Sequence, residues 1–126
     1  MLLCLTSTGF ACAAVYGLLK KKYVLSATSL VTYAASVGYW AKERPGCFRH
    51  KVDGVVSKVS FVIYTVHGIV QVKSCLAWPC WFAIVASFWL SKHLRNRRTD
   101  RLWVYAHAGF HAFVTSGQFL VIRQFR

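Results

Sequence analysis

The sequence predicts an all-α, polytopic membrane protein, a bundle of about five transmembrane helices joined by short basic loops. The first observation behind this prediction is composition. Hydrophobic residues make up 56% of the 126 residues and charged residues only 15%, whereas soluble domains contain about 25% charged residues. A soluble domain of this size buries too small a share of its surface to hide so many apolar side chains. Intrinsic disorder is excluded as well, because disordered chains are poor in hydrophobic residues.

The second observation is where the charges lie. The chain has 16 lysines and arginines against three acidic residues, a net charge of +13, yet only one of the basic residues, Lys58, falls inside a long apolar run. Each run is about 18–21 residues long, enough for a helix rising 1.5 Å per residue to cross a hydrocarbon core of about 30 Å. We therefore expect one membrane-embedded domain, residues 1–126, with helices at residues 2–19, 23–41, 54–72, 75–90 and 102–122.

Each run has its own support. The first two carry no charged residue. The third contains Lys58 close enough to its start for the ammonium group to reach the membrane interface. The fourth is the shortest and has Pro79 near its first turn, where the missing N–H is tolerated. The fifth contains His107 and His111 but no lysine, arginine or carboxylate. A β-barrel would instead need segments of about ten residues that alternate apolar and polar, so helices are favoured.

The basic loops predict an orientation and a set of contacts. With five spans, the N-terminus and the loops at 42–53 and 92–101 share one side, which holds nine lysines and arginines against six on the other. This difference favours an N-terminus on the inside. We expect the protein to lie in the lipid bilayer, with its basic loops on anionic lipid head groups. The residues expected at head groups are Lys20, Lys21, Lys22, Arg95, Arg97 and Arg98. Nucleic acid is not expected as a partner, because the apolar composition argues against it.

Polar residues recur inside the second, third and fifth apolar runs. They fall at steps of three and four, which places them on one face of each helix. The stripes contain Ser29 and Tyr33 in the second run, Ser57, Ser60, Tyr64 and His67 in the third, and Thr115 and Gln118 in the fifth. Because lipid offers no hydrogen bonds to such groups, we expect the stripes to face one another around a polar interior and to hold the helices together.

Two histidines are candidates for a metal site. His107 and His111 are four residues apart, so both imidazoles project from one helical face, as in pairs that bind a single metal ion. His50 and Asp53 lie at the mouth of the third run, on the same side of the predicted bundle as His107. This placement predicts a zinc site with His50, His107 and His111 as ligands. The alternative is that these histidines pack and form hydrogen bonds without a metal.

Three segments carry a resemblance to a known family: Tyr105–Val114 (YAHAGFHAFV), Ser36–Trp40 (SVGYW) and Asp53. They resemble motifs of the seven-helix membrane hydrolase superfamily that includes alkaline ceramidases, progestin and adiponectin receptors and hemolysin III-type proteins. The resemblance implies a zinc ion held by three histidines, with Ser36 and Asp53 near the attacking water, and hydrolysis of an amide bond in a lipid. The chain departs from the family in having five predicted helices rather than seven, and Trp40 where the family has its first histidine.

Three functions are consistent with these observations. The first is a structural or assembly subunit of a larger membrane complex, in an organelle membrane or a virus particle, with other protein subunits as partners. The second is a zinc-dependent lipid amide hydrolase or an inactive relative of one. The third is a small ion or proton pathway along the polar stripes. The sequence favours the first, without enzymatic activity, because so few residues lie outside the apolar runs to build a separate globular site.

Overall fold

The computed structural model describes residues 1–42, 44, 46–71, 77–97 and 101–124. They form five α-helices: α1 (Leu2–Leu19), α2 (Tyr23–Trp40), α3 (Phe48–Gln71), α4 (Ala77–Asn96) and α5 (Leu102–Gln124). No strand occurs among these residues, and the prediction of an all-α chain with five helices is confirmed. By length and composition, one helix of the described chain, α1, qualifies to cross a membrane, with a mean hydropathy of 1.8.

Three helices extend beyond their predicted ends. The third begins at Phe48 rather than at residue 54, the fourth continues to Asn96 rather than ending at residue 90, and the fifth continues to Gln124 rather than ending at residue 122. The predicted ends were set where charged residues begin, but arginine and lysine are good helix formers and do not stop a helix. Residues 72 and 75–76 of the predicted third and fourth helices lie outside the described residues.

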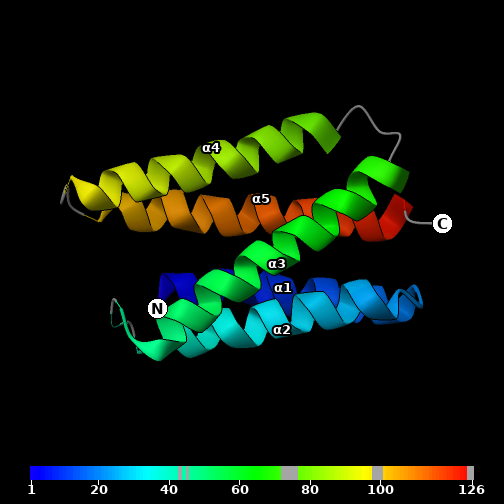
Figure 1. The fold of residues 1–126 in the computed structure, drawn as a ribbon, viewed down its shortest axis with the longest axis horizontal. Helices are drawn as coiled ribbons and strands as arrows, with labels where there is room; N and C mark the ends of the chain where they lie inside the picture. Colours follow the sequence, from blue (N-terminus) through cyan, green and yellow to red (C-terminus); the bar gives the residue numbers. More distant parts are fainter. Residues whose placement is uncertain (43, 45, 72–76, 98–100, 125–126) are drawn as a thin grey trace.

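The helices form two antiparallel hairpins and a crossing helix (Figure 1). The α1–α2 hairpin and the α4–α5 hairpin are joined by packing of α1 against α5, and α3 runs diagonally from the end of α2 towards the far end of α5. The N-terminus, the α2–α3 connection and the α4–α5 connection lie at one end of the bundle, which we call the N-terminal end. The α1–α2 turn and the end of α5 lie at the opposite end.

Small residues allow the closest approaches between helices. A β-carbon added at Gly9 of α1 would lie 2.6 Å from Oγ1 of Thr115 in α5. A β-carbon added at Gly17 would lie 3.1 Å from the Cα atom of Ser26 in α2. Ser26 also donates its hydroxyl proton to the carbonyl of Ala14 at 2.6 Å. Glycine and serine therefore let α1 pack tightly against both α5 and α2, as small residues do between membrane helices.

Among the described residues, polar side chains form a large part of the interior and apolar side chains a large part of the surface. Nearly half of the buried residues are polar: Ser7, Ser26, Ser29, Thr32, Ser36, Ser60, Ser91, His111 and Gln118. Many large apolar side chains are exposed instead, and they occur on all five helices: examples are Leu5 (66% exposed), Val24 (64%), Val55 (61%), Trp89 (71%) and Leu102 (57%). Soluble monomers rarely expose contiguous apolar patches larger than a few hundred Å².

Candidate functional site

A ladder of side-chain hydrogen bonds joins α2 to α3. The hydroxyl of Tyr64 donates to the carbonyl of Leu25 at 2.9 Å and therefore accepts from Ser29 at 2.6 Å. One turn along, the hydroxyls of Thr32 and Ser60 lie 2.6 Å apart. The polar faces of the second and third helices thus meet directly, each group using a partner on the neighbouring helix.

The last rung of this ladder pairs the two residues to which the family resemblance assigns catalysis. The Ser36 hydroxyl donates to Oδ1 of Asp53 at 2.9 Å, and this bond joins the last turns of α2 to the first turns of α3. Ser36 is buried and Asp53 is half-buried. In this geometry the serine donates one hydrogen bond to the carboxylate, and the pair ties α2 to the first turns of α3.

One member of the ladder was missed in the sequence. Thr32 fills the position between Ser29 and Ser36, where the predicted stripe has Tyr33, which is half-buried. Both residues lie on nearly the same helical face, at i+3 and i+4 from Ser29. The i+3 spacing was the signal for Thr32, but it could not be separated from the i+4 spacing of Tyr33 without knowing how α2 is rotated. Ser57, also in the predicted stripe, is half-buried and makes no side-chain hydrogen bond within the described part of the chain.

His111 lies at the junction of α1 and α5. It is 2% exposed, and its Nδ1 atom lies 3.0 Å from Oγ1 of Thr6 and 3.4 Å from Oγ of Ser7. Both hydroxyls also donate to the carbonyl of Leu3, so the ring nitrogen supplies the proton for the bond between the helices. The ring of Phe10 packs edge-on against the imidazole, with centroids 5.2 Å apart. His111 is therefore a packing and hydrogen-bonding residue between the two hairpins.

His107 lies beside His111 and bonds in the opposite direction, to α4. The two imidazole centroids are 4.9 Å apart, and Nδ1 of His107 lies 3.0 Å from the hydroxyl of Ser91. The two histidines thus link α5 to α1 and to α4 through hydroxyl groups. Ser91 was not among the sequence candidates, although Ser87, four residues earlier on the same face of the helix, was a signal that could have indicated it.

His50 does not join the other two histidines. Its Nδ1 atom accepts the backbone N–H of Gly46 at 3.0 Å, and its ring stacks on Tyr39 at 4.8 Å between centroids. Tyr39 in turn contacts Trp40 at 4.5 Å, and Trp40 contacts His107 at 5.0 Å. The rings of Tyr39 and Trp40 therefore lie between the imidazoles of His50 and His107, with the indole of Trp40 in contact with His107.

The predicted zinc site is not formed by the described residues. No group of three or more histidine, cysteine, aspartate or glutamate side chains there is arranged to hold a metal ion. A catalytic zinc has three protein ligands, and His107 and His111 provide two. The described residues do not support His50 as a third ligand, because the contacts with Gly46 and Tyr39 hold its imidazole away from His107.

The remaining candidates of the polar stripes occupy separate places. Nδ1 of His67 lies 2.7 Å from the carbonyl of Ile63 in its own helix. Thr115 faces Gly9, and Gln118 is 3% exposed. Within the described residues, four buried side-chain atoms have no hydrogen-bond partner: Nε1 of Trp40, Nε1 of Trp81, Oγ1 of Thr115 and Oε1 of Gln118.

The basic residues expected at lipid head groups lie at both ends of the bundle. Lys20, Lys21 and Lys22 form the α1–α2 turn, in which Lys21 has a left-handed φ of 57°. At the N-terminal end, the guanidinium of Arg95 lies 4.9 Å from the ring centroid of Trp103 and donates to the hydroxyl of Tyr39 at 3.4 Å. Arg97 is exposed at the end of α4, whereas Arg98 lies outside the described residues.

Comparisons of the chain with protein-family models, with curated proteins and with solved structures found no match. The class of protein is therefore argued from the fold and from the polar contacts between its helices.

Proposed function

We propose that the chain is a multi-pass integral membrane protein, in which all five helices span the bilayer, and that it serves as a structural subunit of a larger membrane complex. One observation carries the proposal: hydroxyl, imidazole and amide groups are buried between the helices, while large apolar side chains cover the outside of every helix. In lipid this arrangement is favourable, because apolar side chains face hydrocarbon and polar groups find partners in the protein.

The ends of the helices support the same proposal. Basic residues lie at both ends of the bundle, where lipid phosphates would lie. Lys58, the eleventh of the 24 residues of α3, is exposed, and in lipid its long side chain would extend towards the membrane interface. Polar and charged residues lower the mean hydropathy of the other four helices. Some of these polar residues, such as Ser29, Thr32 and His107, form hydrogen bonds between helices.

The exposed outer face of α3 supports the subunit role. α3 packs along α2 and reaches α5 only near its far end. Its outer face carries four valines at steps of four, three and four, all more than half exposed: Val55, Val59, Val62 and Val66. The connections between helices are too short to form a separate domain. Protein partners in the membrane are therefore expected to pack against helices rather than against loops.

Purification in a gentle detergent tests the subunit role. We expect the chain to migrate with partner subunits at a mass well above its own 14.3 kDa plus the bound detergent, because most of its surface consists of helix faces. Multi-angle light scattering combined with mass spectrometry of the eluted peak measures this. A protein that remains monomeric when extracted from its native membrane, with no associated chain, would contradict the subunit role and leave the membrane fold intact.

The zinc-dependent hydrolase stays an alternative for one reason. The structure pairs Ser36 with Asp53 and brings His107 beside His111, as the family resemblance implies. The third ligand is missing from the described residues, so no reaction step is assigned to the pair. The ion or proton pathway has less support, because the imidazoles of His107 and His111 and the hydroxyls of the α2–α3 ladder are engaged in bonds between helices.

A further inference from the structure

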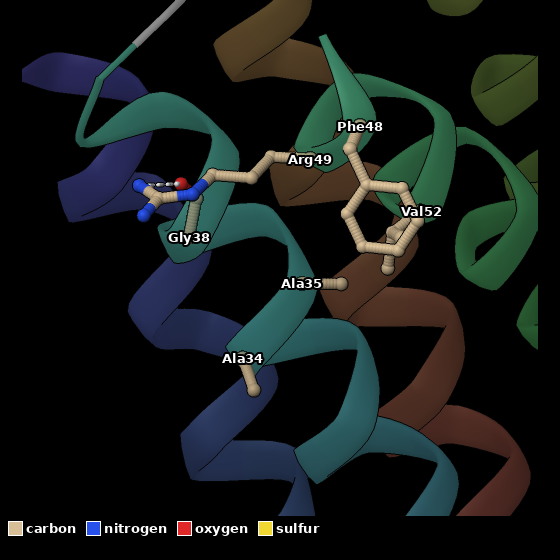
Figure 2. Close-up of a pocket in the computed structure, with 6 residues that line it drawn as sticks. All are labelled: Ala34, Ala35, Gly38, Phe48, Arg49 and Val52. Atoms are coloured by element: carbon tan, nitrogen blue, oxygen red, sulfur yellow. Dashed lines mark hydrogen bonds between the residues drawn. The ribbon is translucent and has the colours of Figure 1, made fainter.

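A groove opens between α2 and α3 at the N-terminal end of the bundle (Figure 2). Its cavity volume is about 170 Å³. Small residues line one wall and apolar residues the other, with an arginine at the rim: Ala34, Ala35 and Gly38 on α2, and Phe48, Arg49 and Val52 on α3. The groove exists because the α2 wall presents only alanine and glycine opposite the Phe48 ring.

The size and lining of the groove limit what can enter it. Pockets that enclose a whole small-molecule ligand measure about 300–1,000 Å³, well above this volume. Phe48 is 79% exposed, so the groove opens to the surroundings of the bundle rather than to its interior. A short stretch of one acyl chain fits such a groove, since hydrocarbon needs no hydrogen bonds from its walls.

Arg49 places a cation at the rim of the groove. Its side chain reaches from α3 to α2, where Nη1 donates to the carbonyl of Gly38 at 3.4 Å (Figure 2). The backbone N–H of Lys42 bonds to Tyr39 instead, which leaves the Gly38 carbonyl for Arg49. This contact uses one of the five N–H groups of the guanidinium. Arg49 is exposed, so its other donors can reach a phosphate at the membrane surface.

The neighbouring charges favour an anionic ligand. Residues 42–51 contain four cations, Lys42, Arg44, Arg49 and Lys51, against the single acid Glu43. The carboxylate of Asp53, farther along α3, accepts a hydrogen bond from Ser36. Arginine pairs well with phosphate because its planar fork can donate two parallel hydrogen bonds.

We propose that this groove binds one anionic phospholipid, with an acyl chain against Ala35, Phe48 and Val52 and its phosphate on Arg49. The site rests on the proposed membrane function, because an acyl chain is available only if the outer face of α2 and α3 lies in lipid. The bound lipid would cover the gap between the two helices and add a tie across their N-terminal ends.

Native mass spectrometry of the full chain tests the site, using detergent micelles doped with equal amounts of phosphatidylglycerol and phosphatidylcholine. We expect one phosphatidylglycerol to be retained in preference to phosphatidylcholine. The Arg49→Gln variant removes the cation and Ala35→Leu fills the groove. Arg49→Gln is expected to reduce retention roughly tenfold, the effect of losing a charge-assisted hydrogen bond of about 1.4 kcal/mol or more. Ala35→Leu is expected to reduce retention to a similar extent, because the larger side chain occupies the space of the acyl chain. Two matched controls should retain the lipid as the parent does: Arg123→Gln, exposed near the end of α5, and Ala27→Leu, exposed on α2 outside the groove.

Three outcomes would overturn the proposal. The first is equal retention of the two lipids, and the second is unchanged retention in Arg49→Gln and Ala35→Leu. The third is displacement of the lipid by millimolar inorganic phosphate, which would mean that the arginine binds free phosphate rather than a lipid head group. The same variants, reconstituted into sealed vesicles, are labelled at engineered cysteines to establish which helix ends lie on opposite sides of the membrane. Loss of the lipid preference with that topology intact refutes the groove alone, whereas loss of both refutes the membrane assignment.

Discussion

Replacing Gly9 with alanine is expected to push α1 away from α5 and to lower the free energy of unfolding by about 1–3 kcal/mol, the usual cost of overpacking a helix interface. The added β-carbon would lie 2.6 Å from Oγ1 and 3.0 Å from Cγ2 of Thr115. Threonine is β-branched and has few alternative rotamers in a helix, so the helices must move apart. Denaturant unfolding in micelles, followed by circular dichroism, measures the change.

Two further variants show whether the effect comes from this contact. Gly109→Ala in α5 adds the same methyl group where no neighbouring atom lies within 4 Å, and we expect unchanged or slightly higher stability because alanine favours helix. Gly9→Ala combined with Thr115→Ala should recover most of the loss, since the clashing Oγ1 and Cγ2 atoms are gone. Equal stability of Gly9→Ala and Gly109→Ala would show that α1 and α5 do not pack through Gly9.

The second large effect is expected for His111→Ala. The imidazole is 2% exposed, packs on Phe10 and bonds to Thr6 across the α1–α5 junction. Truncation leaves a cavity and removes the bond between the helices, and we expect a loss of about 2–5 kcal/mol, as for other large buried side chains. His93→Ala, at an exposed position of α4, is the matched control and should change stability by less than about 0.5 kcal/mol.

Adding zinc or the chelator EDTA distinguishes a packing role of His111 from a metal-binding role. If His111 acts by packing and hydrogen bonding, neither EDTA nor added zinc should alter the melting temperature of the parent protein. A bound metal would stabilise the folded state by mass action. A melting temperature that falls with EDTA in the parent protein, but not in the His111→Ala variant, would contradict the packing role and restore the zinc site.

The number of helices was predictable because lysines and arginines separate five apolar runs. The charges did not mark the ends of the helices. Arg49 and Lys51 lie inside α3, and Lys92 and Arg95 lie inside α4. A cation ends the part of a helix that hydrocarbon can cover, but the backbone hydrogen bonds continue beyond it. Sequence patterning therefore predicts the apolar length of a helix better than its total length.

The polar contacts were predictable in kind and only partly in detail. Spacing of three and four indicated which residues share a face, and Ser29, Ser60 and Tyr64 lie at the α2–α3 interface. Spacing does not reveal which helices are neighbours or how each is rotated. The pairing of His111 with Thr6 joins residues 105 positions apart, and it depends on α1 packing against α5, which no local pattern specifies.

The position of His50 depends on how aromatic rings pack around it, and the spacing of residues in the sequence does not predict this packing. The predicted ligand set assumed that a loop histidine could turn towards His107. Contacts among aromatic rings prevent this, because His50 stacks on Tyr39, Tyr39 contacts Trp40, and Trp40 contacts His107. In the sequence, Trp40 is visible as a departure from the family motif. Its effect on the site, a ring packed beside His107, is seen only in the structure.

Cysteine accessibility across a sealed membrane tests the central proposal, that five helices span the bilayer, most directly. In a background without native cysteines, single cysteines replace Lys20, Lys42, Arg97 and Val62 in turn, and a charged, membrane-impermeant maleimide is added to one side of oriented vesicles. Lys42→Cys and Arg97→Cys should react from one side and Lys20→Cys only from the other. Val62→Cys, 58% exposed at the middle of α3, should react from neither. Labelling of all three end positions from the same side, or ready labelling of Val62→Cys, would contradict the five-span membrane fold.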